Sequence, residues 1–189
     1  MDVKEAILKR RAYRSLKEVE ISEELIKDLA ECASLAPSCF NNQPWRFVFV
    51  YDKEIQKKLH TALNPGNEWA YSSSMIIAVF SKKELDCQIK GRDYYLFDTG
   101  MAVAFLMLRA TELGLVAHPI AGYNEEKVKE ILNIPKDMQV ITLIIVGEKS
   151  EEINKTLTEK QIEFEYKRPE RLSLEKFVYF NEYKKNGEQ

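Results

Sequence analysis

The chain has 189 residues, of which 45% are apolar, so it is long enough for one domain around a continuous hydrophobic core. Its formal net charge of −2 gives no global attraction to nucleic acid or to an anionic membrane. The longest uninterrupted apolar run, residues 101–108, is far shorter than the roughly 20 residues that span a bilayer. The opening residues, MDVKEAILKRR, place charges among apolar positions, unlike a secretory signal. We therefore expect a cytosolic protein that binds neither nucleic acid nor a membrane.

The few cysteines and histidines limit the chemistry that the side chains themselves supply. Cys32, Cys39 and Cys87 are scattered and odd in number, so we expect reduced, mostly buried thiols and neither a disulfide framework nor a metal motif. His60 and His118 are the only histidines, which is too little material for a His-rich metal site or a catalytic triad. We therefore expect the chemistry to come from a bound cofactor.

Apolar spacing predicts three helices and two strands in the first half of the chain. Residues 2–11 indicate a short amphipathic helix with Val3, Ile7 and Leu8 facing inward. Ser22 is expected to cap the second helix, because serine side chains accept hydrogen bonds from the first turn. The elements expected next are a strand at 46–51, a helix capped by Asp52 and running to about residue 63, and a strand at 75–80.

The second half begins with a long helix, expected from about Tyr94 to Leu113 and ended by Gly114. It is apolar on nearly every face, so it must be covered all round, either inside a layered domain or by a second subunit. The elements expected after it are a strand at 115–118, a helix at 125–132, a strand at 139–146 and a charged tail whose residues 172–183 have helical spacing.

The segment from Lys9 to Arg14, KRRAYR, has four cations within six residues where the first predicted helix ends. One interpretation is a solvated basic turn, because runs of charge usually face water. The other is an anion site. Arg10 and Arg14 lie four residues apart, and guanidinium groups form bidentate hydrogen bonds with a phosphate.

The segment from Ala36 to Trp45, APSCFNNQPW, lies between the second helix and the first strand. Its two prolines make a stiff loop around Ser38, Asn41 and Gln43, and the amide side chains both donate and accept hydrogen bonds. A turn with polar decoration is the simpler interpretation. The arrangement is more specific than a turn requires, and it is suited to the edge of a flat heterocycle.

The order of these segments resembles that of the FMN-dependent nitroreductase family. The shared features are the RR-x-x-R turn, the APSxxNxQPW loop, the long apolar helix, LGLVAHPIAG at 113–122 and a late arginine before the last predicted helix. The resemblance extends from Lys9 to about Val178. It implies an α+β nitroreductase-like fold, one FMN-binding domain over residues 1–189, with a mixed, largely antiparallel sheet flanked by helices. It also implies an intertwined homodimer in which residues 150–189 form a tail that wraps the partner subunit.

The resemblance also implies which residues bind FMN. Cations from both ends of the sequence would bind the phosphate: Arg10, Arg11, Arg14, Arg171 and, as a further candidate, Arg168. The APSCFNNQPW loop would contact the flavin of the other subunit through Pro37, Ser38, Asn41 and Gln43.

The ring itself would lie beside a second segment, formed by Pro119, Ile120, Ala121 and Gly122. The backbone N–H groups of Ala121 and Gly122 would lie near flavin N5 and O4, where they stabilise the negative charge that builds up when hydride arrives. Asn67 would be a further contact. Ala12 departs from the family pattern, since many relatives have a serine there that helps to hold the phosphate or ribityl chain. The contact at Ala12 is then backbone only or lost, and lower FMN affinity is expected.

Three residues near these segments keep two interpretations each. Trp69 is either a wall of the pocket or part of the core. His118 is either a proton donor to the reduced product or an exposed or capped histidine, since water supplies protons equally well. Cys39 is either a site of oxidation or a small buried hydrophobe. We assign none of them a catalytic role.

The activity that the resemblance implies is transfer of electrons from NADH or NADPH to a small organic acceptor, such as a nitroaromatic or a quinone. The mechanism would be ping-pong, with the hydride chemistry at flavin N5 and no catalytic side chain. The alternatives are a flavin-binding redox sensor with little turnover, or a specialised relative that dehalogenates or fragments the flavin. Such specialists usually carry a lid before the long apolar helix. Residues 81–92 are short here, which favours a general reductase.

Overall fold

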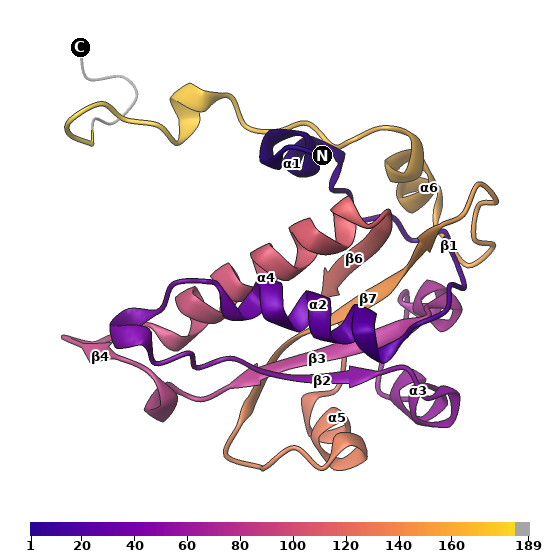
Figure 1. Cartoon of the computed structure of the whole chain (residues 1–189). Helices are drawn as coiled ribbons and strands as arrows, with labels where there is room; N and C mark the ends of the chain where they lie inside the picture. Colours follow the sequence, from indigo (N-terminus) through magenta and orange to yellow (C-terminus); the bar gives the residue numbers. More distant parts are fainter. Residues whose placement is uncertain (184–189) are drawn as a thin grey trace.

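The computed structural model describes residues 1–183, so the last six residues of the expected tail, 184–189, lie outside the described residues. Its main sheet has five strands, and every pairing between them is antiparallel. The strands are β1 (Leu16–Lys17), β2 (Arg46–Val50), β3 (Met75–Ser81), β6 (Leu115–Ile120) and β7 (Gln139–Lys149). The longest, β7, pairs with β1, β3 and β6 and is the centre of the sheet (Figure 1).

Helices cover both faces of this sheet, which gives an α+β fold. One face carries α2 (Glu23–Ser34) and α4 (Tyr95–Glu112), and the other carries α3 (Lys53–His60), α5 (Glu125–Leu132) and the short 3₁₀ helix η2 (Glu68–Ser72) (Figure 1). Side chains alternate across a strand, so Met75 and Ile77 of β3 face α2 and α4, whereas Ile76 enters the core on the opposite face. The sheet thus lies between two hydrophobic cores.

Several helix boundaries follow from the caps that the sequence predicts. The Ser22 hydroxyl accepts a hydrogen bond from the Leu25 N–H at 3.2 Å, and the Asp52 carboxylate accepts one from the Ile55 N–H at 2.9 Å. Gly114 follows α4 with a φ of 82°, a left-handed conformation that glycine adopts without strain. The predicted caps of α2 and α3 and the predicted end of α4 are therefore confirmed.

The two ends of the chain depart from the sequence prediction. The first helix, α1 (Val3–Lys9), exposes Val3, Ile7 and Leu8 and buries only Ala6, so their predicted inward orientation is wrong. The reason is that α1 lies at the edge of the fold and packs against the end of α4 by one narrow face. The helix predicted over 172–183 is also wrong, because that segment contains only the 3₁₀ turn η4 (Leu174–Lys176) among its described residues.

The sequence analysis missed a helix in the charged tail, α6 (Glu159–Tyr166). Thr158 and Gln161 form a capping box at its start, in which each side chain accepts from the other's backbone N–H. After α6 the chain passes α1 and extends away from the sheet (Figure 1). None of the helices within residues 1–183 has both the length and the apolar character needed to cross a membrane.

Candidate functional site

The basic segment after α1 is held in place by a carboxylate from the far end of the sequence. Glu165 of α6 is buried and accepts hydrogen bonds from the backbone N–H groups of Arg14 at 2.8 Å and Ser15 at 3.1 Å. Both carboxylate oxygens are used, one for each N–H. Glu165 therefore fixes the backbone from which the predicted phosphate-binding arginines project.

The described structure brings four of the five predicted phosphate-binding arginines into one cluster. Burial lowers the pKa of Arg10, and the positive charges of Arg168, Arg171 and Arg11 lower it further. Arg168 donates to the backbone carbonyls of Leu8 and Arg10, the latter at 3.0 Å, and thereby ties the tail to α1. Arg11 donates to the carbonyl of Phe164. Within residues 1–183 none of these four arginines forms an ion pair, so the cluster offers an uncompensated positive charge to an anion.

The fifth arginine, Arg14, lies beside the cluster on an aromatic surface. Its guanidinium carbon is 5.8 Å from the centre of the Trp69 ring, and burial lowers its pKa whereas the charge of Glu165 raises it. Trp69 is 1% exposed and its ring stacks on that of His118, with 4.7 Å between ring centres. Trp69 therefore belongs to the core, and its ring also supports Arg14. Ala12, between these arginines, is exposed and offers only backbone atoms to a ligand.

His118 is buried beneath this surface and is not an exposed histidine. Its Nδ1 lies 3.0 Å from the Tyr13 carbonyl oxygen, which only accepts, so Nδ1 carries the proton. Burial lowers the pKa of His118 to about 4, with smaller contributions from the charges of Arg14 and Arg10, although the hydrogen bond to Tyr13 opposes the shift. The imidazole is therefore neutral near pH 7 and connects β6 to the basic segment.

The turn after β6 brings the predicted ring-binding residues next to η2. Asn67 donates from Nδ2 to the Gly122 carbonyl at 3.0 Å, and the Asn64 N–H donates to the same oxygen at 2.9 Å. A Cβ atom on Gly122 would lie 2.5 Å from Asn67 Nδ2, so a larger residue here would displace the Asn67 amide from its hydrogen bond to the Gly122 carbonyl. Among the described residues, no protein group accepts a hydrogen bond from the backbone N–H of Ala121 or of Gly122.

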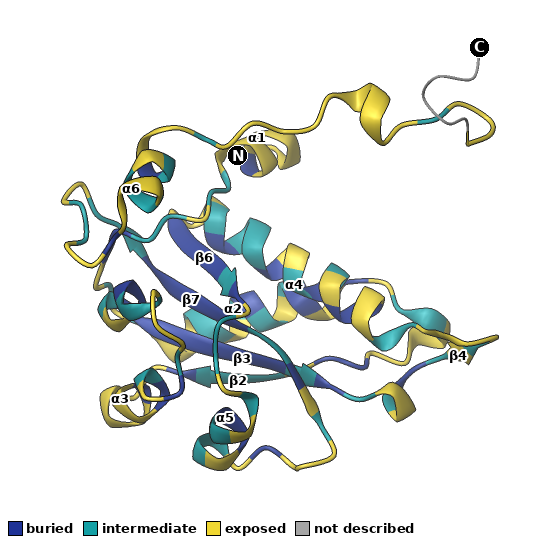
Figure 2. Ribbon diagram, turned by 180° about the vertical axis from the view of Figure 1, so that it is seen from behind, coloured by how far each residue is buried: buried dark blue, intermediate teal, exposed yellow. Residues whose placement is uncertain are grey.

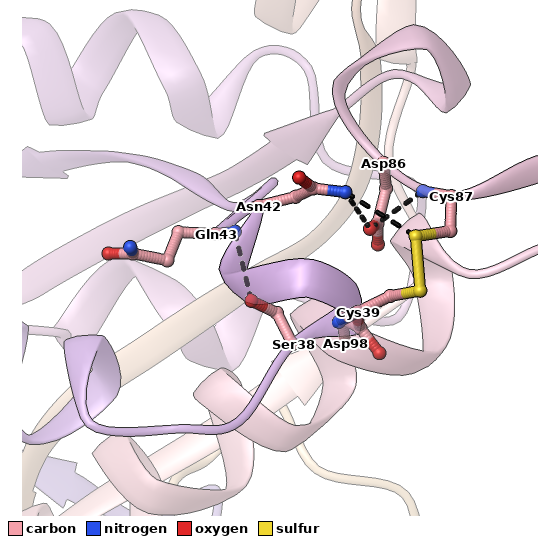
Figure 3. Close-up of a disulfide and its surroundings, with 7 residues drawn as sticks. All are labelled: Ser38, Cys39, Asn42, Gln43, Asp86, Cys87 and Asp98. Atoms are coloured by element: carbon pink, nitrogen blue, oxygen red, sulfur yellow. Dashed lines mark hydrogen bonds between the residues drawn. A yellow bond between two sulfur atoms is a disulfide. The ribbon is translucent and has the colours of Figure 1, made fainter.

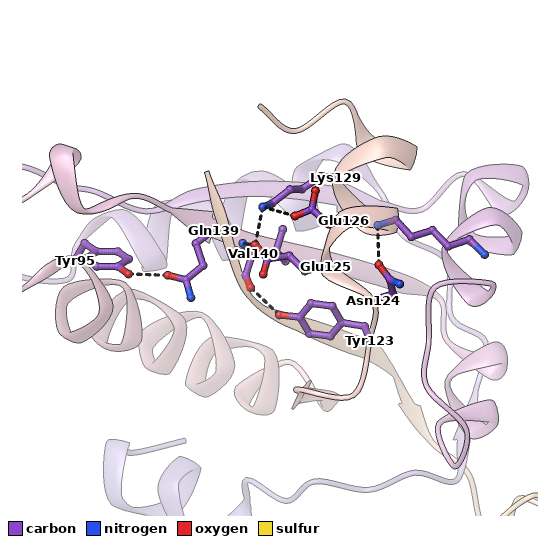
Figure 4. Close-up of polar contacts among 9 residues, drawn as sticks. Tyr95, Tyr123, Asn124, Glu125, Glu126, Lys129, Gln139 and Val140 are labelled. Carbon is purple, nitrogen blue, oxygen red and sulfur yellow. Dashed lines mark hydrogen bonds and ion pairs between the residues drawn. The ribbon is translucent and has the colours of Figure 1, made fainter. Parts of the chain in front are cut away.

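The residues that follow fasten this turn to β7 (Figure 4). The Tyr123 hydroxyl donates to the Val140 carbonyl at 2.8 Å, and Glu125 accepts from the Val140 N–H at 3.0 Å. Burial raises the pKa of Tyr123 to about 12, so its hydroxyl keeps its proton. Pro119 and Ile120 pair with β7 directly, opposite Ile144 and Leu143. The segment 119–122 is therefore rigidly placed beside the centre of the sheet.

The predicted flavin-contacting loop, residues 37–43, lies elsewhere in the same chain. It follows the C-terminal end of α2 and sits at the start of α4, where the Cys39 N–H donates to the Asp98 carboxylate at 2.7 Å. The basic segment lies beyond the opposite end of α2, a 12-residue helix of about 18 Å. Pro37, Asn41 and Gln43 are exposed. One chain thus connects the basic segment to η2 through Arg14 and Trp69, and η2 to the turn after β6 through Asn67 and Gly122. Pro37, Ser38, Asn41 and Gln43 are not part of this group, because their loop lies at the start of α4.

A disulfide joins this loop to the segment before α4, which corrects the expectation of reduced thiols (Figure 3). Cys39 and Cys87 are linked across 48 residues of sequence, with 6.1 Å between their Cα atoms, and only Cys32 is free. The spacing of the cysteines contained no signal for this pair. The two become neighbours only because η1 (Cys39–Asn41) and the residues before the hairpin of β4 (Gln88–Ile89) and β5 (Arg92–Asp93) meet at one end of α4.

Two acidic residues that position the site were missed by the sequence analysis. Glu165 gave no signal, because a glutamate in a charged tail is expected to face water. Asp98 carried one, since it is a carboxylate in the otherwise apolar first half of α4. Burial and the neighbouring Asp86 raise the pKa of Asp98, whereas the hydrogen bond from Cys39 lowers it.

Comparison with known proteins identifies the fold and the family. The Nitroreductase family model matches residues 7–68 and 60–148. A protein of Archaeoglobus fulgidus, provisionally named NADH dehydrogenase/NAD(P)H nitroreductase, is 31% identical over 145 residues, which are 75% of this chain and 82% of that protein. The crystal structure of a nitroreductase family protein from Clostridium novyi NT has a TM-score of 0.74 and 28% identity, covering 80% of this chain and 87% of the other. A structure described as an oxidoreductase containing FMN shares the fold with a TM-score of 0.82 at 23% identity, over 97% of this chain and 94% of the other.

These matches cover most of the chain, including the basic segment, the 37–43 loop and the turn after β6. The chain belongs to the nitroreductase family. It is therefore an enzyme of the oxidoreductase class, with a nitroreductase fold.

The buried state of His118 predicts how stability depends on pH. As the pH falls through 6.5 the unfolded chain takes up a proton at this residue, whereas the folded protein does so only near its pKa of about 4. Stability from this residue is thus complete above pH 6.5 and is lost progressively from there down to about pH 4. We expect the free energy of unfolding to fall by about 2 kcal/mol from this source between pH 7.5 and pH 5.

Urea unfolding at the two pH values measures this effect. The variant His118→Gln should lose that part of the pH dependence, whereas His60→Gln should retain it. Burial also lowers the pKa of His60, so the control variant His60→Gln should lose only the pH dependence of stability that His60 itself contributes. Equal pH dependence in His118→Gln and the parent protein would contradict the prediction.

Proposed function

We propose that the chain is an FMN-dependent oxidoreductase that transfers electrons from NADH or NADPH to a small organic acceptor, nitroaromatic or quinone in type. The observation that carries the proposal is the cluster of Arg10, Arg11, Arg168 and Arg171. Like charges drawn from sequence positions about 160 residues apart repel one another. The cluster therefore fits a dianionic ligand such as a phosphate monoester, which would relieve the repulsion.

Arg14 would add the fifth cation to this phosphate site. Its guanidinium lies on the Trp69 ring and is half-buried, so little water competes for its hydrogen bonds. Arg11 and Arg168 each use part of their donor capacity on backbone carbonyls, and a guanidinium has five N–H groups, so donors remain for a phosphate. Ala12 would contribute its backbone only.

The turn at 119–122 supplies what the ring of the cofactor would need. When bound, FMN supplies the hydride chemistry at its N5 atom. The N–H groups of Ala121 and Gly122, which have no acceptor within residues 1–183, are donors for negative charge on that ring, and Gly122 has no side chain to block a close approach. Asn67 holds the Gly122 carbonyl and orients the turn. Pro119 and Ile120 keep it against β7. Another protein with this fold is described as containing FMN, so the fold accommodates the cofactor.

We propose that the site is completed by a second copy of the chain. Pro37, Ser38, Asn41 and Gln43 lie at the start of α4, apart from the basic segment, which fits a site built across a homodimer. Exposed positions occur on α1, on α4 and in the tail (Figure 2). The large apolar residues among them are Val3, Ile7, Leu8, Leu96, Phe97, Phe105, Leu172, Leu174, Phe177 and Phe180. A cavity of about 320 Å³ between α1 and α4 adds to this surface. The described part of the tail, 150–183, would wrap the partner.

The mechanism proposed is a ping-pong exchange of hydride in which the chain binds, orients and excludes water. His118 donates its Nδ1 proton to the Tyr13 carbonyl and is neutral and buried, so it positions the basic segment and is no proton source. Protons would come from water.

Nicotinamide as the electron donor is supported by the name of the Archaeoglobus relative. One domain over residues 1–189 and a cytosolic location remain predictions from the sequence.

The first test is the absorbance spectrum of the purified protein, which should be yellow and should release one FMN per subunit on denaturation. Steady-state oxidation of NADH and NADPH with a quinone or nitroaromatic acceptor should then show continuous turnover. A flavin sensor would instead be reduced once and stall, and a colourless protein that fails to bind added FMN would contradict the proposal.

The variant Arg14→Ala should weaken FMN binding and leave the fold intact. Loss of a hydrogen-bonding partner of a charged group costs about 1.5 to 3 kcal/mol, or roughly a 10- to 150-fold rise in Kd. Turnover at saturating FMN should recover, because Arg14 is assigned to the phosphate and not to the ring. FMN titration of the apo-protein and NADPH oxidation measure the two parts. Lys136→Ala, which removes an exposed cation beside α5, is the matched control and should change neither.

The quaternary structure is tested by sedimentation at micromolar concentration. We expect a dimer, because covering α4 and the tail calls for an interface on the order of 2,000 Å² or more. A folded monomer with bound flavin would contradict the shared site.

A further inference from the structure

The loop at 37–43 has a backbone shape that two of its residues, Phe40 and Gln43, do not favour. Phe40, Asn41 and Gln43 have φ angles of 48°, 58° and 49°, in the left-handed region that glycine adopts most readily. Bulky side chains such as Phe40 are strained there, and strained conformations persist only where surrounding contacts over-determine them. The contacts that hold this loop therefore decide whether Ser38, Asn41 and Gln43 are presented in the observed arrangement.

Three kinds of contact hold the loop, and only one is covalent (Figure 3). The Gln43 N–H donates to the Ser38 hydroxyl at 3.0 Å, and the Cys39 N–H donates to Asp98 at 2.7 Å. Asn42 donates from Nδ2 to Asp86 at 3.2 Å. The covalent contact is the disulfide from Cys39, in the middle of the loop, to Cys87.

The segment at the other end of the disulfide is also outside the main sheet. Cys87 precedes the β4–β5 hairpin, whose two strands pair only with each other within residues 1–183. Both cysteines are half-buried, so a thiol reagent reaches them more easily than it would reach a core residue. The bond therefore joins two peripheral segments, and breaking it leaves both hydrophobic cores in place.

We propose that the Cys39–Cys87 disulfide is a reversible redox latch, which holds the 37–43 loop in its FMN-binding shape when oxidised and releases it when reduced by a dithiol. The proposal rests on the proposed function, since it concerns the loop assigned to the flavin. Reduction frees a loop that must be ordered again when FMN binds, and ordering about one side chain at a binding site corresponds to roughly 2- to 10-fold weaker affinity.

Reduction of the disulfide transfers two electrons and two protons from the dithiol to the two cysteines. A thiolate of the dithiol attacks one sulfur of the bond, forms a mixed disulfide and releases the other cysteine as a thiolate, which takes up a proton. The second thiol of the reductant then attacks the reductant's own sulfur in the mixed disulfide. The reductant is thereby oxidised to a disulfide, and the second cysteine is released as a thiol. A small-molecule disulfide reverses the sequence.

The charges around the disulfide favour a latch that opens and closes slowly over a cysteine pair that is oxidised and reduced in every catalytic cycle. Asp86 and Asp98 flank the two sulfurs, and the Oδ2 atom of Asp86 is buried without a hydrogen-bond partner among the described residues. Negative charge beside a thiol disfavours the reactive thiolate. Asp86 and the two sulfurs also lie close enough together to resemble a metal site, but the disulfide uses both sulfurs.

The test compares the protein purified without reductant with the same protein after treatment with dithiothreitol. Maleimide labelling of the denatured protein should show one free thiol, Cys32, before reduction and three after it. Titration of the apo-protein should show 2- to 10-fold weaker FMN binding after reduction. Limited proteolysis of the apo-protein should show faster cleavage within 37–43, which gives a readout that does not depend on FMN.

Variants separate the latch from a general effect of the reductant. Cys87→Ser should bind FMN as the reduced protein does and should not respond to dithiothreitol, whereas Cys32→Ser should respond fully. Three free thiols in the untreated protein, or unchanged cleavage and affinity after reduction, would overturn the latch. Failure to bind FMN in either state would overturn the proposed function alone, and the proteolysis result would still decide whether the disulfide holds the loop.

Discussion

Strand β7 is buried on both faces and hydrogen-bonded along both edges, and the other parts of the fold are placed by reference to it. Leu143 and Ile145 enter one core and Ile144 and Val146 enter the other, so a change of register by one residue would exchange the two sets. Its pairing with β6 fixes the turn at 119–122, and its pairing with β1 fixes the residues after the basic segment. The turn at 119–122 and the residues after the basic segment are therefore attached directly to the central strand of the sheet.

The site itself combines groups that do not attract one another. Within residues 1–183 the four clustered arginines form no ion pair, and backbone contacts hold two of them: Arg168 donates to the carbonyls of Leu8 and Arg10, and Arg11 donates to a carbonyl of α6. Glu165 fixes the adjacent backbone through the N–H groups of Arg14 and Ser15. This arrangement leaves the guanidinium charge available. A cluster assembled by salt bridges would be neutralised by its own partners and would bind an anion weakly.

The two halves of the proposed flavin site differ in how they are supported. The turn at 119–122 is attached to the central sheet and is closely packed against Asn67. The loop at 37–43 lies at the periphery and depends on a few hydrogen bonds and one disulfide for a strained backbone. A binding site with one rigid side and one side that depends on a disulfide is suited to regulation, because only the loop at 37–43 has to change conformation.

The sequence by itself determined most of the longer helices and strands and the chemistry of the short motifs, but not α6 or the structure of residues 172–183. The caps at Ser22 and Asp52, the short apolar strand β3 and the glycine after α4 follow from local rules that act within a few residues, so they were predictable. The same holds for the composition of the basic segment and of the 37–43 loop.

Tertiary structure alone decided that Cys39 meets Cys87, that Glu165 is buried against Arg14, and that His118 lies neutral beneath Tyr13. It also left Val3, Ile7 and Leu8 exposed despite their amphipathic spacing. These outcomes join residues from about 50 to 150 positions apart, and no local pattern encodes which distant group will lie opposite. Burial, pairing and pKa shifts depend on that neighbour, which exists only once the chain has folded.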